Sequence, residues 1–104
     1  MPDRSDKQGR KDKLHQWRAQ QRADARARLP LPDLHMQALF DMLDASLRER
    51  ECDHTLRLVR EWAERQGVAL DALVAWCREN GGYCDCEVLA NCEEVWEEAR
   101  HDAT

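Results

Sequence analysis

The fold class is decided by residues 33–47, which read DLHMQALFDMLDASL. The apolar side chains of this stretch recur at helical steps of one, three and four residues, at Met36, Leu39, Phe40, Leu43 and Leu47. Such spacing places them on one face of an α-helix. The stretch therefore predicts a helix that starts near Asp33 and buries one side in a core.

Three segments further along the chain follow the same period. One runs from the turn at 52–55 to Gly67, and another covers about 69–79 before Asn80-Gly81-Gly82. Glycine ends helices because it tolerates the left-handed conformation. The last segment, with apolar positions from 88 to 99, is expected to be a helix capped by Asp85, with a short strand over 86–90 as the alternative. We predict an all-α fold, a small bundle of about four helices.

Charge divides the chain of 104 residues into two parts. Residues 1–28 hold nine Lys or Arg against four Asp, a balance of +5, whereas residues 29–104 hold seven Arg against seventeen Asp or Glu, a balance of −10. A shift this sharp marks a boundary, and the prolines of Leu29-Pro30-Leu31-Pro32 interrupt any helix that crosses it. We expect a basic N-terminal arm at 1–28, partly helical or disordered, and an acidic helical domain at 29–104.

Two short clusters combine cysteine and histidine at turns that precede helices. They are Cys52-Asp53-His54 and Cys84-Asp85-Cys86. Three thiolates and one imidazole form the Cys3His set that Zn2+ favours in structural sites. We therefore predict that Cys52, His54, Cys84 and Cys86 hold a zinc ion that staples the small bundle.

Other interpretations of these residues stay open. Cys84 and Cys86 could pack as small apolar side chains or form a redox pair. Asp53 and Asp85 either hydrogen-bond to the metal ligands without binding the metal themselves or, as we prefer, cap the helices that follow. Cys77 falls on the apolar stripe of its helix and is expected in the core. Cys92 is expected in the core too; alternatively, it could take the place of one of the four predicted zinc ligands.

The motifs around these clusters resemble a known family. They are Leu29-Pro30-Leu31-Pro32, Leu39-Phe40-Asp41, Cys52-Asp53-His54-Thr55-Leu56-Arg57 and Gly81-Gly82-Tyr83-Cys84-Asp85-Cys86-Glu87-Val88-Leu89-Ala90-Asn91. Over about residues 29–92 the chain resembles the bacterial domain-of-unknown-function family 2695. The resemblance implies a small domain of bacterial proteins, without an established activity to carry over. The basic arm and the acidic segment 93–104 lie outside that pattern.

The arm carries a stripe of cations. Lys11, Arg18, Arg22 and Arg26 recur at helical steps of seven, four and four. Such a stripe can bind the phosphates of nucleic acid by counterion release. The alternatives are a solvated arm, or an arm that docks on the acidic domain of its own or a second chain.

The sequence favours a non-enzymatic binding or adaptor module with a protein partner. Four protein ligands would close the zinc site, so no position would remain for water or substrate. The alternatives are a metal-dependent enzyme with an open zinc position and a base such as Glu87, or a nucleic-acid-associated regulator that uses the arm. No apolar run reaches the roughly 20 residues of a membrane span, and five cysteines without an export signal favour the cytoplasm.

Overall fold

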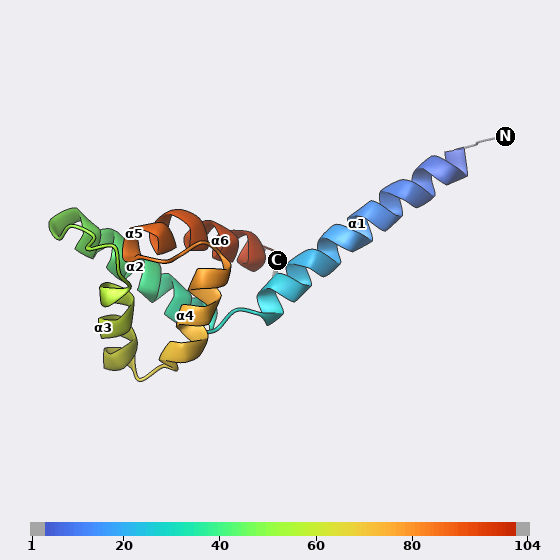
Figure 1. Cartoon of the computed structure of the whole chain (residues 1–104). Coiled ribbons are helices and arrows are strands. Elements are labelled where there is room, and N and C mark those ends of the chain that lie inside the picture. Colours follow the sequence, from blue (N-terminus) through green and yellow to red (C-terminus); the bar gives the residue numbers. More distant parts are fainter. Residues whose placement is uncertain (1–3, 102–104) are drawn as a thin grey trace.

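The computed structural model describes the backbone of residues 4–101 and the side chains of residues 13–100, and this part of the chain is helical without any strand (Figure 1). The elements in order are α1 (Arg4–Ala27), α2 (Asp33–Glu49), α3 (Arg57–Gln66), α4 (Leu70–Glu79), α5 (Asp85–Glu87), the π-helical turn η1 (Val88–Cys92) and α6 (Glu93–His101). The all-helical prediction is confirmed. The expected count of about four helices is slightly low, because five helices of nine or more residues occur when α1 is included.

Helix α2 forms the centre of the core. Four of the five apolar positions predicted to be buried are fully buried, and Leu47 packs against them from the edge. The ring of Phe40 lies 5.5 Å from that of Trp96 on α6, a spacing typical of favourable aromatic pairs. The indole N–H of Trp96 donates to Asp33 Oδ1 at the start of α2, at 3.2 Å. The core is thus built between α2 and the C-terminal helix.

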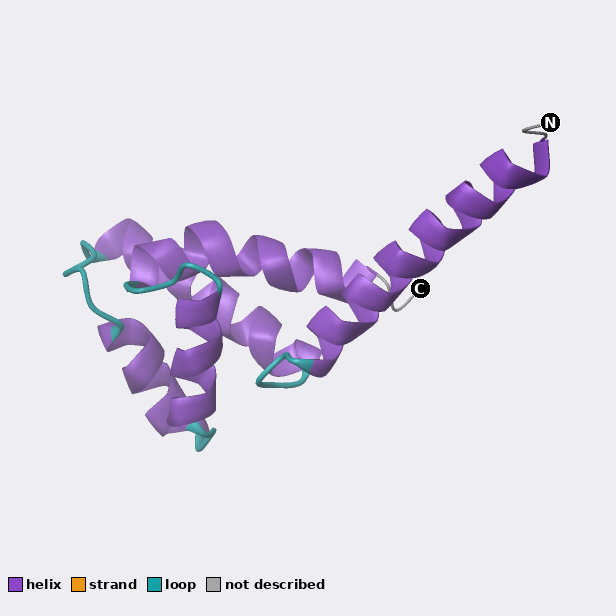
Figure 2. Ribbon diagram, turned by 45° about the vertical axis from the view of Figure 1, so that its right-hand side comes forward, coloured by secondary structure: helices purple, strands orange, loops and turns teal. Residues whose placement is uncertain are grey.

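Helices α3 and α4 form a hairpin that packs beside α2 (Figures 1 and 2). Gly67 ends α3 with a φ of 68°, in the left-handed conformation that the sequence predicted for it. Leu58, Val59 and Trp62 of α3 are buried in the core, together with Leu73 and Trp76 of α4.

The C-terminal segment is one helical run from 85 to 101 with a π-helical turn inside it. The N–H of Glu93 donates to the carbonyl of Val88, five residues earlier, which is the π-helical pattern. Val88, Cys92 and Trp96 are all fully buried although they lie four residues apart. A step of four overshoots the 3.6-residue turn of an α-helix, so the wider turn keeps these side chains on one face. The alternative strand over 86–90 is therefore wrong.

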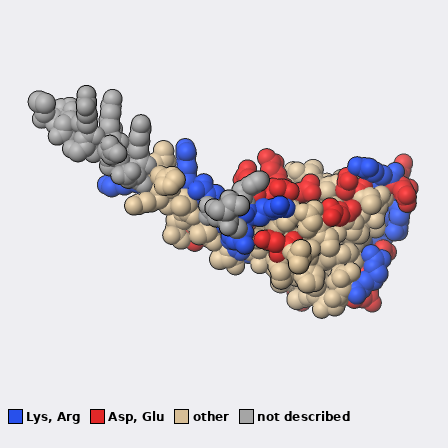
Figure 3. Space-filling model, turned by 180° about the vertical axis from the view of Figure 1, so that it is seen from behind, with Lys and Arg blue, Asp and Glu red and all other residues tan. Residues whose placement is uncertain are grey.

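Helix α1 projects from the rest of the molecule and meets it only near its C-terminal end, against α6 (Figure 2). The structure is 63 Å long and no more than 24 Å across in the other directions. At the junction, Arg26 pairs with Asp33 at 3.4 Å and donates to the carbonyl of Ala99 at 3.5 Å. On the face shown in Figure 3, acidic side chains are spread over the body with cationic ones among them at its far end, and further cationic side chains lie near the junction with α1. Among the described residues, no helix is long and apolar enough to cross a membrane.

Candidate metal centre

Three cysteines from two distant loops converge on one point. The sulfur atoms of Cys52, Cys84 and Cys86 all lie within 4.8 Å of one another, and those of Cys84 and Cys86 are 3.3 Å apart. Cys52 lies in the loop between α2 and α3, while Cys84 and Cys86 lie at the start of α5. The cluster passes from buried Cys84 through half-buried Cys52 to exposed Cys86. These three residues could hold a metal ion, and they are three of the four predicted ligands.

Backbone N–H groups point at the sulfur of Cys52. His54 adopts a left-handed φ of 66°, uncommon for a residue with a side chain, and its N–H thereby donates to Cys52 Sγ at 3.4 Å. Burial alone would raise the pKa of the Cys52 thiol, but the N–H groups of Cys86 and His54 and the two neighbouring thiols lower it overall. Burial raises the pKa of Cys84 to about 12. Three thiols this close need a cation before all of them can ionise.

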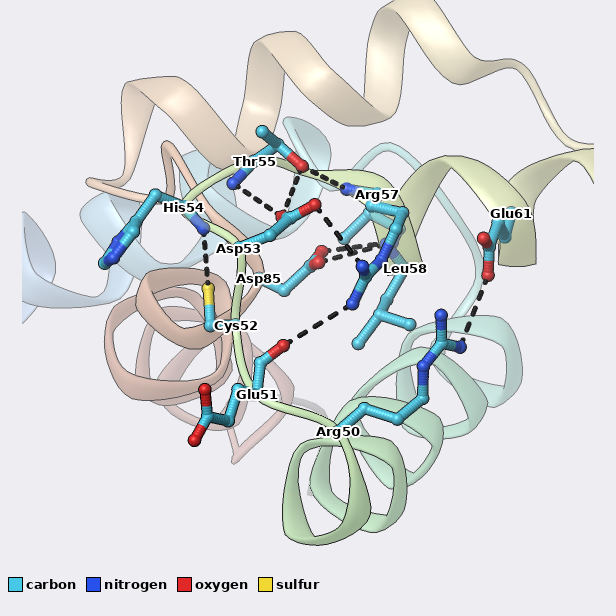
Figure 4. Close-up of polar contacts among 11 residues, drawn as sticks. Arg50, Glu51, Cys52, Asp53, His54, Thr55, Arg57, Leu58, Glu61 and Asp85 are labelled. Carbon is cyan, nitrogen blue, oxygen red and sulfur yellow. Dashed lines mark hydrogen bonds and ion pairs between the residues drawn. The ribbon is translucent and has the colours of Figure 1, made fainter.

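The imidazole of His54 is not part of the cluster. Its side chain is exposed and points to the outer side of the loop, away from Cys52 Sγ (Figure 4). The structure thus brings together three of the four predicted ligands, and the place of His54 as the fourth remains a prediction.

Asp85, which lies between Cys84 and Cys86 in the sequence, caps helix α3. Its fully buried carboxylate accepts hydrogen bonds from the N–H groups of Leu58 at 3.0 Å and Val59 at 3.2 Å. Its own N–H donates to the carbonyl of Thr55 at 2.9 Å. Burial raises the pKa of Asp85, and the two hydrogen bonds to its carboxylate oppose that rise. Asp85 was expected to cap the last helix, but no side chain makes a capping hydrogen bond at the start of α5.

Asp53 organises the other ligand loop. Its Oδ1 accepts hydrogen bonds from the N–H of Thr55 at 3.0 Å and from the hydroxyl at 2.6 Å, while Oδ2 pairs with Arg57 at 3.4 Å (Figure 4). The Thr55 hydroxyl is the main cause of the lowered pKa of Asp53. Thr55 Oγ1 accepts in turn from the N–H of Arg57, the first residue of α3. Both predicted capping aspartates therefore serve the start of α3, Asp53 through Thr55.

The remaining cysteines lie apart from the cluster. Cys77 and Cys92 are fully buried in the core, and Cys92 Sγ donates to the carbonyl of Cys77 at 3.4 Å. Hydrogen bonding with Cys92 is the first cause of the raised pKa of Cys77, and it lowers that of Cys92. Both thiols occupy the core positions expected of them, and neither joins the three-cysteine group.

The predicted cationic stripe lies on α1. The side chain of Lys11 is outside the described residues, and that of Arg18 is exposed. Arg22 is half-buried, and Arg26 anchors the helix to the body through Asp33. The stripe therefore runs from the projecting part of α1 to its docked end.

Fold and site together define a small helical domain with a cysteine cluster between two loops. The family described as "Protein of unknown function (DUF2695)" matches residues 39–91, which contain the whole cluster. The chain belongs to this family.

Its relatives include the uncharacterized protein Rv2271 of Mycobacterium tuberculosis (strain ATCC 25618 / H37Rv) and the uncharacterized protein Mb2294 of Mycobacterium bovis. Each is 37% identical over 67 residues, which cover 64% of this chain and 68% of the relative. No solved structure matches the chain.

Proposed function

We propose that this chain is a zinc-stabilised helical binding module in which Cys52, His54, Cys84 and Cys86 hold one Zn2+. The observation that supports this proposal is the convergence of three thiols from loops about 30 residues apart in the sequence. In a tetrahedral site with sulfur ~2.3 Å from zinc, two sulfurs lie about 3.8 Å apart. The cluster, with one pair at 3.3 Å and all pairs within 4.8 Å, suits that spacing.

His54 supplies the fourth ligand in this proposal. It lies two residues after Cys52, and its exposed side chain can turn about its own bonds without displacing the core. Its N–H already holds the sulfur of Cys52, so the loop is shaped around that ligand. A Cys3His set closes the coordination sphere, which suits a structural ion.

The ion would add a cross-link to a domain whose core is small because the domain is small. The acidic helical domain expected at 29–104 is of a size that buries only about 60% of its unfolded surface. Zinc would join the loop before α3 to the start of α5, next to the cap that Asp85 provides. The module would then present a stable helical surface to a protein partner. All five cysteines are free, which suits a reducing compartment such as the cytoplasm.

A second candidate is a metal-dependent enzyme with an open zinc position. The observation in its favour is that, among the described side chains, only three ligand atoms converge, while the imidazole of His54 points away. A water molecule in the fourth position could be activated by the metal, with exposed Glu87 beside Cys86 as the base.

Metal analysis tests both candidates. Protein purified without added metal should contain one equivalent of zinc, and alanine at Cys52, Cys84 or Cys86 should remove it. The full chain with His15→Ala is the matched control, because His15 is exposed on α1. In the cobalt-substituted protein, His54→Ala should change the visible spectrum if His54 is a ligand. An unchanged spectrum would favour the open site, and metal-free protein that stays folded with reduced cysteines would refute both.

A further inference from the structure

Helix α1 combines a projecting position with a cationic face that the proposed zinc site leaves unused. A helix of 24 residues is about 36 Å long, and only its C-terminal part meets α6 (Figure 1). Leu14, Arg18, Arg22 and Arg26 follow one another in steps of four residues and so share one side of the helix. On another side, Gln20 donates to Asp24 at 2.9 Å. At the docked end of this side, Arg26 is held by Asp33 and Ala99 and Arg22 is half-buried, whereas Arg18 is exposed on the projecting part of the helix.

We propose that the projecting part of α1, up to Arg18, binds the phosphate backbone of double-stranded DNA, without strong sequence preference. Charge complementarity carries the proposal, because residues 1–28 have a balance of +5 while residues 29–104 have one of −10. The acidic body repels a polyanion, so the projecting helix is the part of the molecule that DNA can approach. Two bonds from Arg26 to Asp33 and Ala99 fix the helix to the body.

The exposed tryptophan of the chain, Trp17, lies on the same helix. Trp17 is 59% exposed and Leu14 is 49% exposed, and both lie on the projecting part of α1. The other three tryptophans are buried. An α-helix fits the major groove of B-form DNA, about 12 Å wide, whereas the major groove of duplex RNA is too narrow for side chains to read. We therefore commit to DNA as the partner.

The test is binding of a fluorescently labelled, mixed-sequence DNA duplex of about 20 base pairs, which is longer than α1. The full chain should bind with a Kd of about 10⁻⁴–10⁻⁶ M at physiological salt, and more weakly as salt rises. Lys11→Glu combined with Arg18→Glu should weaken binding at least about tenfold and lower the salt slope by about two. Circular dichroism checks that the variant keeps its helices.

The matched control is Arg60→Glu combined with Arg65→Glu, which makes the same charge change at exposed positions of α3. This control should bind DNA like the unaltered chain. Addition of unlabelled DNA should also change the tryptophan fluorescence of the full chain, and Trp17→Phe should abolish that change. Equal losses in both double variants, or binding that does not depend on salt, would overturn the proposal. Tighter binding to duplex RNA or to vesicles of anionic phospholipid would also overturn it.

Discussion

Replacing Asp85 by alanine should destabilise the domain more than its place in a three-residue helix suggests. The carboxylate is fully buried and receives the N–H groups of Leu58 and Val59, which lie in the first turn of α3. Alanine leaves both groups without an acceptor in a site that is closed to water. The start of α3 and the neighbouring cysteine cluster should loosen together.

The magnitude follows from the two hydrogen bonds. A bond to a charged acceptor contributes about 1.5–3 kcal/mol, so the pair contributes about 3–6 kcal/mol. Burial raises the pKa of Asp85, which means that desolvation of the carboxylate offsets part of this gain. We expect a net loss of about 2–4 kcal/mol. In a domain of this size such a loss lowers Tm by at least about 8 °C.

Thermal melts and urea titrations of Asp85→Ala and Asp85→Asn, at equal metal content, measure this loss. Asparagine keeps one acceptor oxygen and should fall between alanine and the unaltered chain. Asp71→Ala is the control, because Asp71 is an exposed acid in the first turn of α4. A loss in Asp85→Ala no larger than that of the control would refute the capping role.

Three further changes test the fold around the site. Burial, and then the charge of Glu97, raises the pKa of Glu93, so the ionisation of Glu93 opposes folding. The stability of the domain should therefore fall as the pH rises from below 4.5 through the raised pKa of Glu93. In thermal melts at pH 7, Glu93→Gln should have a higher Tm than the unaltered chain. Gly82→Ala would place a Cβ 2.8 Å from Cys92 Sγ, and urea unfolding should show a loss of about 1–3 kcal/mol. Cys77→Ser buries a hydroxyl at a similar cost of about 1–3 kcal/mol without changing the metal content, whereas loss of one metal equivalent would identify Cys77 as a ligand.

The helices were predictable because their signals are local. The apolar period beginning at Met36 and the left-handed preference of Gly67 depend only on neighbours in the sequence, and both predictions agree with α2 and the end of α3. The π-helical turn at Val88–Cys92 was missed, since its apolar positions fit an ordinary helical period equally well.

The candidate site was partly predictable for a different reason. The Cys-x-His and Cys-x-Cys spacings mark ligand types, and three of those residues do meet. The role of Asp85 depends on a tertiary contact with α3, so the sequence around it indicates only a local cap. No residue next to His54 in the sequence predicts its left-handed backbone conformation either.

The hydrogen bond from the N–H of Asp85 to the carbonyl of Thr55 joins the two ends of the α3–α4 hairpin, so that residues 55–85 form a closed ring. The far side of that ring is the turn at 67–69, where Gly67 and Ala69 are exposed. Residues inserted there would enlarge the ring without moving its ends, and each doubling of a loop costs only about 0.6 kcal/mol. This turn is therefore the place to introduce a peptide tag or a reporter domain while the cysteine cluster at the ring's closure stays intact.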